Sequence, residues 1–234
     1  MPSRLQGVPP RNSGTPFLKV GHRGARAYET ENTLESYEKA IKLGVNAVEL
    51  DVRQSGDGRL VVSHDDSLKR IFGSDIRIQD ATLDELKQLS GGRVPSLEEA
   101  LRFIDKKVDK ILVELKEGGY EKKVLDVVRK LRLQGRVIVV SFNEQALLKV
   151  REEDGKIETG LVYAKHKKPI DAALKLNAKY LLPLYRFTHT RNVEDAHKKN
   201  LKVVVWTINT AKEAQEYIAK GVDGIATDRP DIFN

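Results

Sequence analysis

Cysteine is absent from this chain of 234 residues, which excludes a disulfide framework and catalysis by a thiol. Long apolar runs are absent as well, and this excludes a membrane-spanning helix in the sequence. Residues Met1–Thr15 lack the apolar stretch of a secretory signal, so we interpret them as a polar tail and expect a cytoplasmic protein. The single methionine and the abundance of Lys and Glu resemble the composition of proteins from thermophiles.

Positive charge exceeds negative charge only modestly in this chain. The chain has 41 Lys and Arg against 34 Asp and Glu, a net charge of +7. The basic residues are interleaved with acidic ones and form no patch with aromatic residues, so we expect no nucleic-acid partner. An anionic small-molecule substrate fits this balance. We interpret the basic run Lys165–Lys168 as solvated surface, with attraction of anionic head groups as the alternative.

Short apolar runs alternate with longer helical patterns through the rest of the chain, which predicts right-handed βαβ units and a parallel sheet. The expected strands are Phe17–Gly21, Ala47–Val52, Leu60–Ser63, Ile111–Lys116, Val137–Ser141, Glu158–Tyr163, Tyr180–Leu182, Lys202–Thr207 and Gly224–Ala226. The expected helices are Thr33–Lys42, Leu83–Leu89, Ser96–Ile104, Glu121–Leu131, Glu144–Glu152, Ile170–Leu176, Asn192–Asn200 and Thr210–Lys220.

The number of expected strands indicates the fold class. If Leu60–Ser63 is an excursion and not a strand of the barrel, eight barrel strands remain, and the sequence predicts an α/β fold of the (β/α)8, or TIM, barrel type. No linker divides residues 16–234, so we expect a single domain there after the tail of residues 1–15. The alternative is an open doubly wound sheet, which would need a glycine-rich phosphate turn after the first strand; Gly21–Gly24 is not one.

Polar residues cluster where the expected strands end, which is the catalytic face of such a barrel. His22 and Arg23 follow the first strand and stand between Gly21 and Gly24, two glycines that let a ligand approach closely. A structural histidine beside a surface arginine is the alternative. The position at a strand exit favours the functional interpretation.

Acidic side chains recur on the inner face of two strands. Side chains alternate along a strand, so Glu49 and Asp51 of the second strand share the lumen, as do Glu114 and Lys116 of the strand Ile111–Lys116. With the excursion set aside these two strands are neighbours. Three carboxylates with a lysine nearby suit Mg²⁺ or Ca²⁺ and a phosphate, and they do not suit zinc. A network of ion pairs is the alternative interpretation.

A hairpin is predicted at Asp57-Gly58, because Asp-Gly between two extended runs is a strong turn signal. With a two-residue turn, Asp51 lies opposite His64, which returns this histidine to the carboxylates; a longer loop would shift the register. His22 and His64 then flank one cation. One imidazole can take a proton from the attacking oxygen while the other gives a proton to the leaving oxygen.

The ordered set of motifs resembles the glycerophosphodiester phosphodiesterase family, within the phosphatidylinositol-phospholipase-C-like phosphodiesterases, from Val20 to Ile232. The residues that carry the resemblance are Gly21-His22-Arg23-Gly24, Glu31-Asn32-Thr33, Glu49-Leu50-Asp51, His64-Asp65, Val113-Glu114-Leu115-Lys116, Ser141-Phe142, Val205-Trp206-Thr207, Gly221-Val222-Asp223-Gly224 and Thr227-Asp228-Arg229-Pro230.

The resemblance implies a phosphoric diester hydrolase of lipid and glycerol metabolism that cleaves glycerophosphodiesters to glycerol phosphate and an alcohol through a cyclic intermediate. It implies a divalent cation, magnesium or calcium with manganese as a further option. The implied roles fall on the metal ligands Glu49, Asp51 and Glu114, the acid–base pair His22 and His64, the phosphate contacts Arg23 and Lys116, the glycerol-end residue Trp206, and Glu31 near the metal.

The sequence departs from the family at two places, Thr30 in place of the usual proline and Asp66–Arg70 in place of a threonine-rich segment. The second borders the pocket and bears on substrate preference. The alternatives are a phospholipase of the C type or a lysophospholipase of the D type acting on lipid, and an inactive binding module. The alcohol, the glycerol stereochemistry, the physiological metal and the oligomeric state stay open.

Overall fold

The computed structural model describes residues 16–234. The expected tail, Met1–Thr15, lies outside the described residues. Within the described range, no helix is long and apolar enough to cross a membrane. The cytoplasmic location and the heat adaptation expected from the sequence stay predictions.

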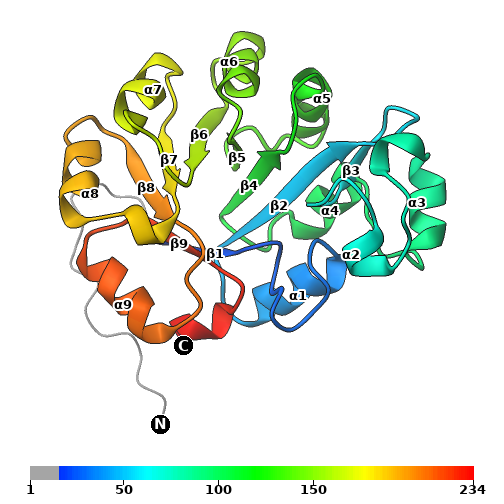
Figure 1. Ribbon diagram of the computed structural model, residues 1–234, viewed down its shortest axis with the longest axis horizontal. Coiled ribbons are helices and arrows are strands. Elements are labelled where there is room, and N and C mark those ends of the chain that lie inside the picture. The colour runs from blue at the N-terminus through cyan, green and yellow to red at the C-terminus, as the bar shows by residue number, and fades with distance from the viewer. Residues whose placement is uncertain (1–15) are drawn as a thin grey trace.

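Eight parallel strands close a barrel in the described part of the chain (Figure 1). The sheet order is β1-β9-β8-β7-β6-β5-β4-β2-β3, and β1 also pairs with β2, which closes the ring. The antiparallel strand β3 extends β2 outside that ring. The strands are β1 (Leu18–Gly21), β2 (Ala47–Gln54), β3 (Leu60–Val62), β4 (Lys110–Leu115), β5 (Val137–Ser141), β6 (Glu158–Tyr163), β7 (Tyr180–Pro183), β8 (Lys202–Val205) and β9 (Gly224–Thr227).

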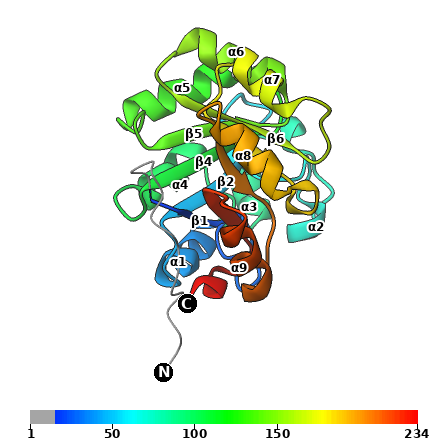
Figure 2. The ribbon, with the colours of Figure 1, turned by 90° about the vertical axis from the view of Figure 1, so that its left-hand side faces the viewer.

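Helices surround the strands, as the side view in Figure 2 shows. The α-helices are α1 (Leu34–Lys42), α2 (Lys69–Phe72), α3 (Leu83–Leu89), α4 (Leu97–Ile104), α5 (Glu121–Lys130), α6 (Glu144–Glu153), α7 (Pro169–Lys175), α8 (Thr190–His197) and α9 (Ala211–Ala219). Short 3₁₀ turns are η1 (Ile78–Asp80), η2 (Tyr185–Phe187) and η3 (Pro230–Phe233). Thr82 and Ser96 cap α3 and α4 in capping boxes with Glu85 and Glu99, as their spacing indicates.

The (β/α)8 prediction is therefore confirmed, and the β1–β2 pairing rules out the open sheet. The excursion interpretation of the third extended run is also confirmed. Helix α2 and the three 3₁₀ turns η1, η2 and η3 were not predicted, because each is only three or four residues long and has no full hydrophobic period.

Side-chain alternation sorts the barrel strands into two apolar layers. Val48, Leu50 and Val52 of β2 pack outward in one cluster with helix residues such as Leu101 and Val124. The opposite faces of the strands fill the lumen, where Leu112 and Val140 belong to a separate cluster. Because the lumen is packed with apolar side chains, polar side chains gather near the carboxyl ends of the strands.

The loop between β2 and β3 is one residue longer than expected, so the predicted opposition of Asp51 and His64 was wrong. Val52 pairs with Val62, and Ser55 donates its backbone N–H to Arg59 O at 2.9 Å, which places Ser63 opposite Asp51. Gly58 has a φ of +78°, a conformation that completes a three-residue hairpin loop. His64 instead reaches the site as the chain leaves the sheet.

The excursion has a small core of its own. One residue of β3 and residues between β3 and α4 form a satellite cluster of buried side chains, Val61, Leu68, Ile78, Ala81, Leu83, Leu86 and Val94. Figure 1 shows α2 and α3, in cyan and green-cyan, beside the barrel at the right. This cluster fixes the path of the chain after His64 independently of the barrel helices.

Candidate active site

The structure brings Glu49, Asp51 and Glu114 together near the carboxyl ends of β2 and β4. Asp51 and Glu114 are register partners on the two strands, and Glu49 lies two residues earlier on the same face as Asp51. One oxygen from each carboxylate lies within 4.8 Å of the others. Two ligands of one ion at about 2.0–2.6 Å can be up to about 5 Å apart, so the spacing suits a single divalent cation.

The donor chemistry also fits a cation. Glu49 and Asp51 are buried, and Glu49 Oε1 has no hydrogen-bond partner among the described residues. A buried carboxylate oxygen without a partner is costly, and a hard cation that takes oxygen ligands would satisfy it. The acidic triad can therefore hold a metal ion.

Two basic side chains contact the triad from opposite sides. Lys116 Nζ lies 2.6 Å from Glu114 Oε1 and 3.3 Å from Asp51 Oδ1. Arg23 donates its backbone N–H to Glu49 Oε2 at 2.8 Å and places Nε 3.1 Å from Asp51 Oδ2. Arg23 has a φ of +54°, unusual for a residue other than glycine, and this conformation aims its N–H at Glu49.

The pKa values of the triad diverge. Burial, together with the neighbouring charges of Asp51 and Glu114, raises the pKa of Glu49 well above its usual range. Burial and Asp51 likewise raise the pKa of Glu114. Burial opposes ionisation of Asp51 too, but Lys116 and Arg23 outweigh it and lower the pKa of that carboxyl. Such separation among close carboxyls is expected when they share too few positive partners.

His22 is held by an aspartate from the far end of the chain. Its Nδ1 lies 2.7 Å from Asp228 Oδ1, just beyond β9. The other oxygen of Asp228 accepts from Asn209 Nδ2 at 2.9 Å, and Asn209 Oδ1 accepts the backbone N–H of Asp228. Burial opposes its ionisation, but the hydrogen bond to His22 lowers the pKa of Asp228. This pair fixes the orientation of the His22 ring.

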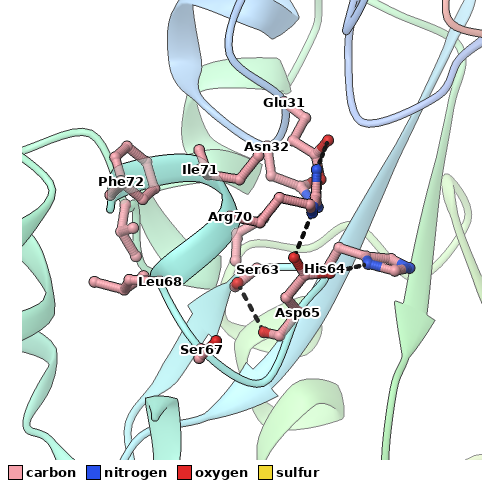
Figure 3. Close-up of a pocket in the computed structure, with 12 residues that line it drawn as sticks. Glu31, Asn32, Ser63, His64, Asp65, Ser67, Leu68, Arg70, Ile71 and Phe72 are labelled. Carbon is pink, nitrogen blue, oxygen red and sulfur yellow. Dashed lines mark hydrogen bonds and ion pairs between the residues drawn. The ribbon is translucent and has the colours of Figure 1, made fainter. Parts of the chain in front are cut away.

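His64 is held in a matching way by the next residue. Its Nδ1 lies 2.7 Å from Asp65 Oδ1, and Arg53 Nε donates to the His64 carbonyl at 3.0 Å (Figure 3 shows the aspartate contact). Burial lowers the pKa of His64, although the charge of Asp51 opposes the shift. That opposing effect also shows that His64 lies within electrostatic reach of the triad.

Glu31 forms an ion pair with Arg23. It accepts from Arg23 Nη1 at 2.8 Å and from both terminal nitrogens of Arg70, at 2.7 and 3.0 Å. Burial opposes its ionisation, but the bonds from Arg70 and Arg23 lower the pKa of Glu31. The next residue, Asn32, donates its side-chain amide to Asp51 Oδ2 at 2.8 Å. The Glu31-Asn32 pair therefore braces both a basic and an acidic member of the site.

Trp206 lies directly after β8 and packs against the lumen cluster. Its indole N–H donates to Leu182 O at 2.7 Å, and its ring meets the exposed ring of Phe142 edge to face at 5.6 Å between centroids. The tryptophan thus combines packing with a position at the carboxyl end of the barrel.

The basic run Lys165–Lys168 is not part of this constellation. Its residues line a separate hollow of about 450 Å³ with Phe187 and Asn192, against the outward-facing Leu181 and Val203 of β7 and β8. This placement agrees with a solvated outer surface.

Some residues around the two histidines had no role assigned from the sequence. Asp228 and Asp65 stood only as parts of motifs, and Arg70, Arg53 and Asn209 were not singled out. The position of Asp228 after the last strand was a usable signal, because the last strand of a barrel lies beside the first. No sequence spacing indicates the contacts of Arg70, which sits on the four-residue helix α2.

Comparisons with known proteins agree with this geometry. The profile of the family described as "Glycerophosphoryl diester phosphodiesterase family" matches residues 22–232. A glycerophosphodiester phosphodiesterase of Caldanaerobacter subterraneus is 32% identical over 92% of this chain and 96% of its own length.

Two solved structures are similar as well. A glycerophosphodiester phosphodiesterase of Thermotoga maritima is 33% identical with a TM-score of 0.77, and the match covers 94% of this chain and 98% of that one. A phosphodiesterase of Oleispira antarctica, solved in complex with the product sn-glycerol-3-phosphate, is 28% identical with a TM-score of 0.83, covering 92% and 94%.

Asp65 is predicted to stabilise the fold in a pH-dependent way. Bonds from Arg70 and His64 overcome burial and lower its pKa to about 2, below its value in the unfolded chain. A lowered folded-state pKa stabilises the protein above the unfolded pKa of about 4, and that stabilisation is lost as the pH falls towards 2. Asp65→Asn should therefore lower the free energy of unfolding by about 1–2 kcal/mol at pH 7 and much less near pH 2.5.

Urea unfolding followed by the fluorescence of Trp206, the only tryptophan, measures this difference across the pH range. Asp75→Asn is the control, because Asp75 pairs with Lys69 on the exposed surface of the same excursion and should change stability by less than about 0.5 kcal/mol. A gap between wild type and Asp65→Asn that stays constant down to pH 2.5 would contradict the interpretation.

Proposed function

Since the chain belongs to the glycerophosphoryl diester phosphodiesterase family, and so is a phosphoric diester hydrolase of glycerophosphodiesters, we propose that it cleaves them to glycerol phosphate and an alcohol with the help of a divalent cation. One observation carries the proposal: the rings of two histidine–aspartate pairs lie within electrostatic reach of a desolvated triad of carboxylates at the catalytic end of the barrel. The glycerol phosphate bound as product by the Oleispira protein supports this choice of product.

Glu49, Asp51 and Glu114 would hold the cation, magnesium or calcium with manganese as a further option. When bound, such an ion stabilises negative charge on the phosphoryl oxygens and lowers the pKa of an attached hydroxyl. Arg23 and Lys116 contact the same triad and would bind the phosphate beside it. Trp206 would face the glycerol, and Glu31 would keep Arg23 in place through their 2.8 Å bond.

The two histidines would move the protons. His22, oriented by Asp228, takes the proton of the glycerol hydroxyl next to the phosphate, and that oxygen attacks phosphorus. His64, oriented by Asp65, gives its proton to the departing alcohol oxygen as the phosphorus–oxygen bond breaks. A cyclic phosphate results, and water opens it while the two histidines exchange roles. Both rings use Nδ1 for the aspartate, which leaves Nε2 for the substrate.

Residues 16–234 would suffice for this activity as one domain, because all the site residues lie within one barrel and its excursion. An inactive binding module would be expected to lack one of the metal-site or histidine residues. Here all five are present and adjoin one another.

A lipid substrate is the second candidate, and one observation favours keeping it. Phe142 is half exposed after β5, on the catalytic face, where its ring packs edge to face against Trp206. An apolar chain attached to the leaving group or to the glycerol could pack on such rings. A lysophospholipase D of Homo sapiens is among the relatives, at 23% identity.

A substrate panel tests the function and its metal dependence together. Glycerophosphoethanolamine, glycerophosphocholine and a lysophosphatidylcholine are incubated with enzyme, with and without chelator, and the released alcohol and glycerol phosphate are measured. We expect cleavage of the first two, loss of activity with chelator, and recovery when magnesium or calcium is restored.

Glu49→Gln should weaken metal binding, measured by calorimetry. Loss of a residue that only contacts a metal ligand typically costs about 10- to 100-fold in affinity, and loss of a ligand itself should cost more. Glu38→Gln, on the exposed face of α1, is the matched control.

In the substrate panel, undiminished turnover in chelator would overturn the metal dependence, and faster cleavage of the lysophospholipid would favour the second candidate.

His22→Ala and His64→Ala should each fold but lose on the order of 10²–10⁴ in turnover, the usual contribution of a positioned acid or base. The steady-state rate on glycerophosphoethanolamine measures the loss, and circular dichroism checks the fold. His197→Ala is the control, since His197 pairs with Asp223 away from the site. Normal turnover in a folded His64→Ala protein would refute its assignment.

The substrate itself is expected to supply the nucleophile. Removing the glycerol hydroxyl next to the phosphate leaves the binding groups in place but removes the attacking oxygen, so kcat should fall far more than KM changes. The comparison uses glycerophosphoethanolamine and its deoxy analogue under identical metal concentrations. Equal rates for the two would mean that water attacks directly and that no cyclic phosphate forms.

A further inference from the structure

Arg70 links the two halves of the site through ionic contacts. Its Nε donates to Asp65 Oδ2 at 2.5 Å, while its two terminal nitrogens donate to the two oxygens of Glu31 (Figure 3). All three of its nitrogens are thus engaged with carboxylates. Bidentate and charge-assisted contacts of this kind are strong and directional, so the side chain is fixed although it is 45% exposed.

On one side, Arg70 determines the orientation of Asp65. The two oxygens of that carboxylate have separate partners, His64 Nδ1 on Oδ1 and Arg70 Nε on Oδ2. With Oδ2 held, the carboxylate cannot rotate away from the imidazole without breaking an ion pair. The ring of His64 therefore keeps one orientation, with Nε2 directed away from Asp65.

On the other side, Arg70 is anchored to the part of the site that binds phosphate. Glu31, its second partner, is buried and also bonds Arg23, which in turn contacts Asp51. Through Glu31, Arg70 thus links the position of His64 to the same residues that hold the carboxylate triad. His64 itself lies on the excursion. Arg53 of β2 holds its backbone carbonyl, and Arg70 adds a link at the side-chain end through Asp65.

The His22 side has a different arrangement. There the second oxygen of Asp228 accepts from the neutral amide of Asn209, and its other charged neighbour, Arg26 Nε, lies 3.9 Å from Oδ1. In both pairs, one aspartate oxygen contacts the Nδ1 of the histidine. The other oxygen accepts from a guanidinium in Asp65 and from a neutral amide in Asp228.

We propose that Arg70 is the positioning residue for His64, holding Asp65 and hence the imidazole in the orientation that delivers a proton to the leaving alcohol. The proposal rests on the proposed function, in which His64 is the acid. Precise positioning of a proton donor matters because a misplacement of about 1 Å can cost 10²-fold in rate. Arg70 touches no substrate and acts through Asp65.

The satellite cluster makes a clean test feasible. Leu68, two residues before Arg70, is buried in that cluster, and Phe72 N donates to Leu68 O at 2.8 Å. The backbone of α2 therefore keeps its support when the guanidinium is removed. Arg70→Gln removes the charge and the fork, Arg70→Lys keeps the charge without the fork, and Arg59→Gln removes an exposed ion pair with Asp84 as the matched control.

The experiment compares two leaving groups on the same glycerol phosphate. Ethanolamine needs a proton as it leaves, whereas 4-nitrophenol leaves readily as an anion, so only the first depends on the acid. We expect Arg70→Gln to lower kcat for the ethanolamine diester about 10- to 100-fold, short of the loss on His64→Ala. For the nitrophenyl diester the loss should stay below about 3-fold, with KM nearly unchanged for both.

Two further variants support or overturn the link. Arg70→Lys should recover part of the ethanolamine rate, because an ammonium reaches one carboxylate at a time. In Asp65→Asn, adding Arg70→Gln should cost little more, since the two residues act as one unit. Equal losses on both leaving groups, a change confined to KM, additive losses in the double variant or an unchanged rate in Arg70→Gln would each overturn the proposal.

A readout without substrate separates this proposal from the proposed function. Nitrogen NMR of the His64 ring reports its tautomer, which Asp65 should hold with the proton on Nδ1 at a pH where the ring is neutral. We expect a single tautomer in wild type and in Arg59→Gln, and a mixture in Arg70→Gln. An inactive wild type with this NMR pattern would refute the function and keep the positioning contact, while one tautomer in every variant would refute the positioning contact.

Discussion

Three carboxylates within 4.8 Å of one another, two of them buried, are the constraint on which the rest of the site depends. Like charges at this spacing in a desolvated lumen repel strongly, so the surrounding structure supplies positive charge and hydrogen-bond donors. Lys116, Arg23 and Asn32 all contact the triad, and Arg23 and Asn32 take left-handed backbone conformations there. Backbone strain of this kind persists where neighbouring contacts compensate for it. The same close spacing that calls for these positive partners is what would let the triad hold a divalent cation.

The closure of the barrel brings His22 to its aspartate partner. His22 and Asp228 are 206 residues apart in the chain and meet because β1 pairs with β9 in parallel register, Gly21 beside Thr227. His64 and Asp65, by contrast, are neighbours in sequence and depend on the excursion for their position. The two pairs look alike locally, yet one depends on pairing between the first and last strands of the barrel and the other on a local turn that Arg70 links to the barrel.

Much of this arrangement could be predicted from the sequence, because it follows from alternation. Glu49, Asp51 and Glu114 share a face by parity alone, and the neighbouring order of their strands follows once the excursion is recognised. Register did not follow, because Asp57-Gly58 suits both hairpins. A two-residue type I′ turn needs a positive φ at Asp57 and at Gly58, whereas the three-residue loop found here needs it only at Gly58. Arg70 did not follow either. Its contacts depend on the path of α2, which is determined by the packing of Leu68 and Ile78. No hydrophobic periodicity in the sequence indicates that path.

The satellite cluster under the excursion has a consequence for fluctuations of the molecule. Contiguous units with their own small cores often open separately from the rest of a protein, at a lower free energy than global unfolding. The amide protons of α2 and α3 would then exchange with solvent ahead of those of the barrel strands. His64 and Asp65 lie at the boundary between these two units, where Arg70 forms an ion pair with Glu31 across it. His64 and the carboxylate triad would thus belong to regions that open at different free energies, and they stay together only while both regions are closed.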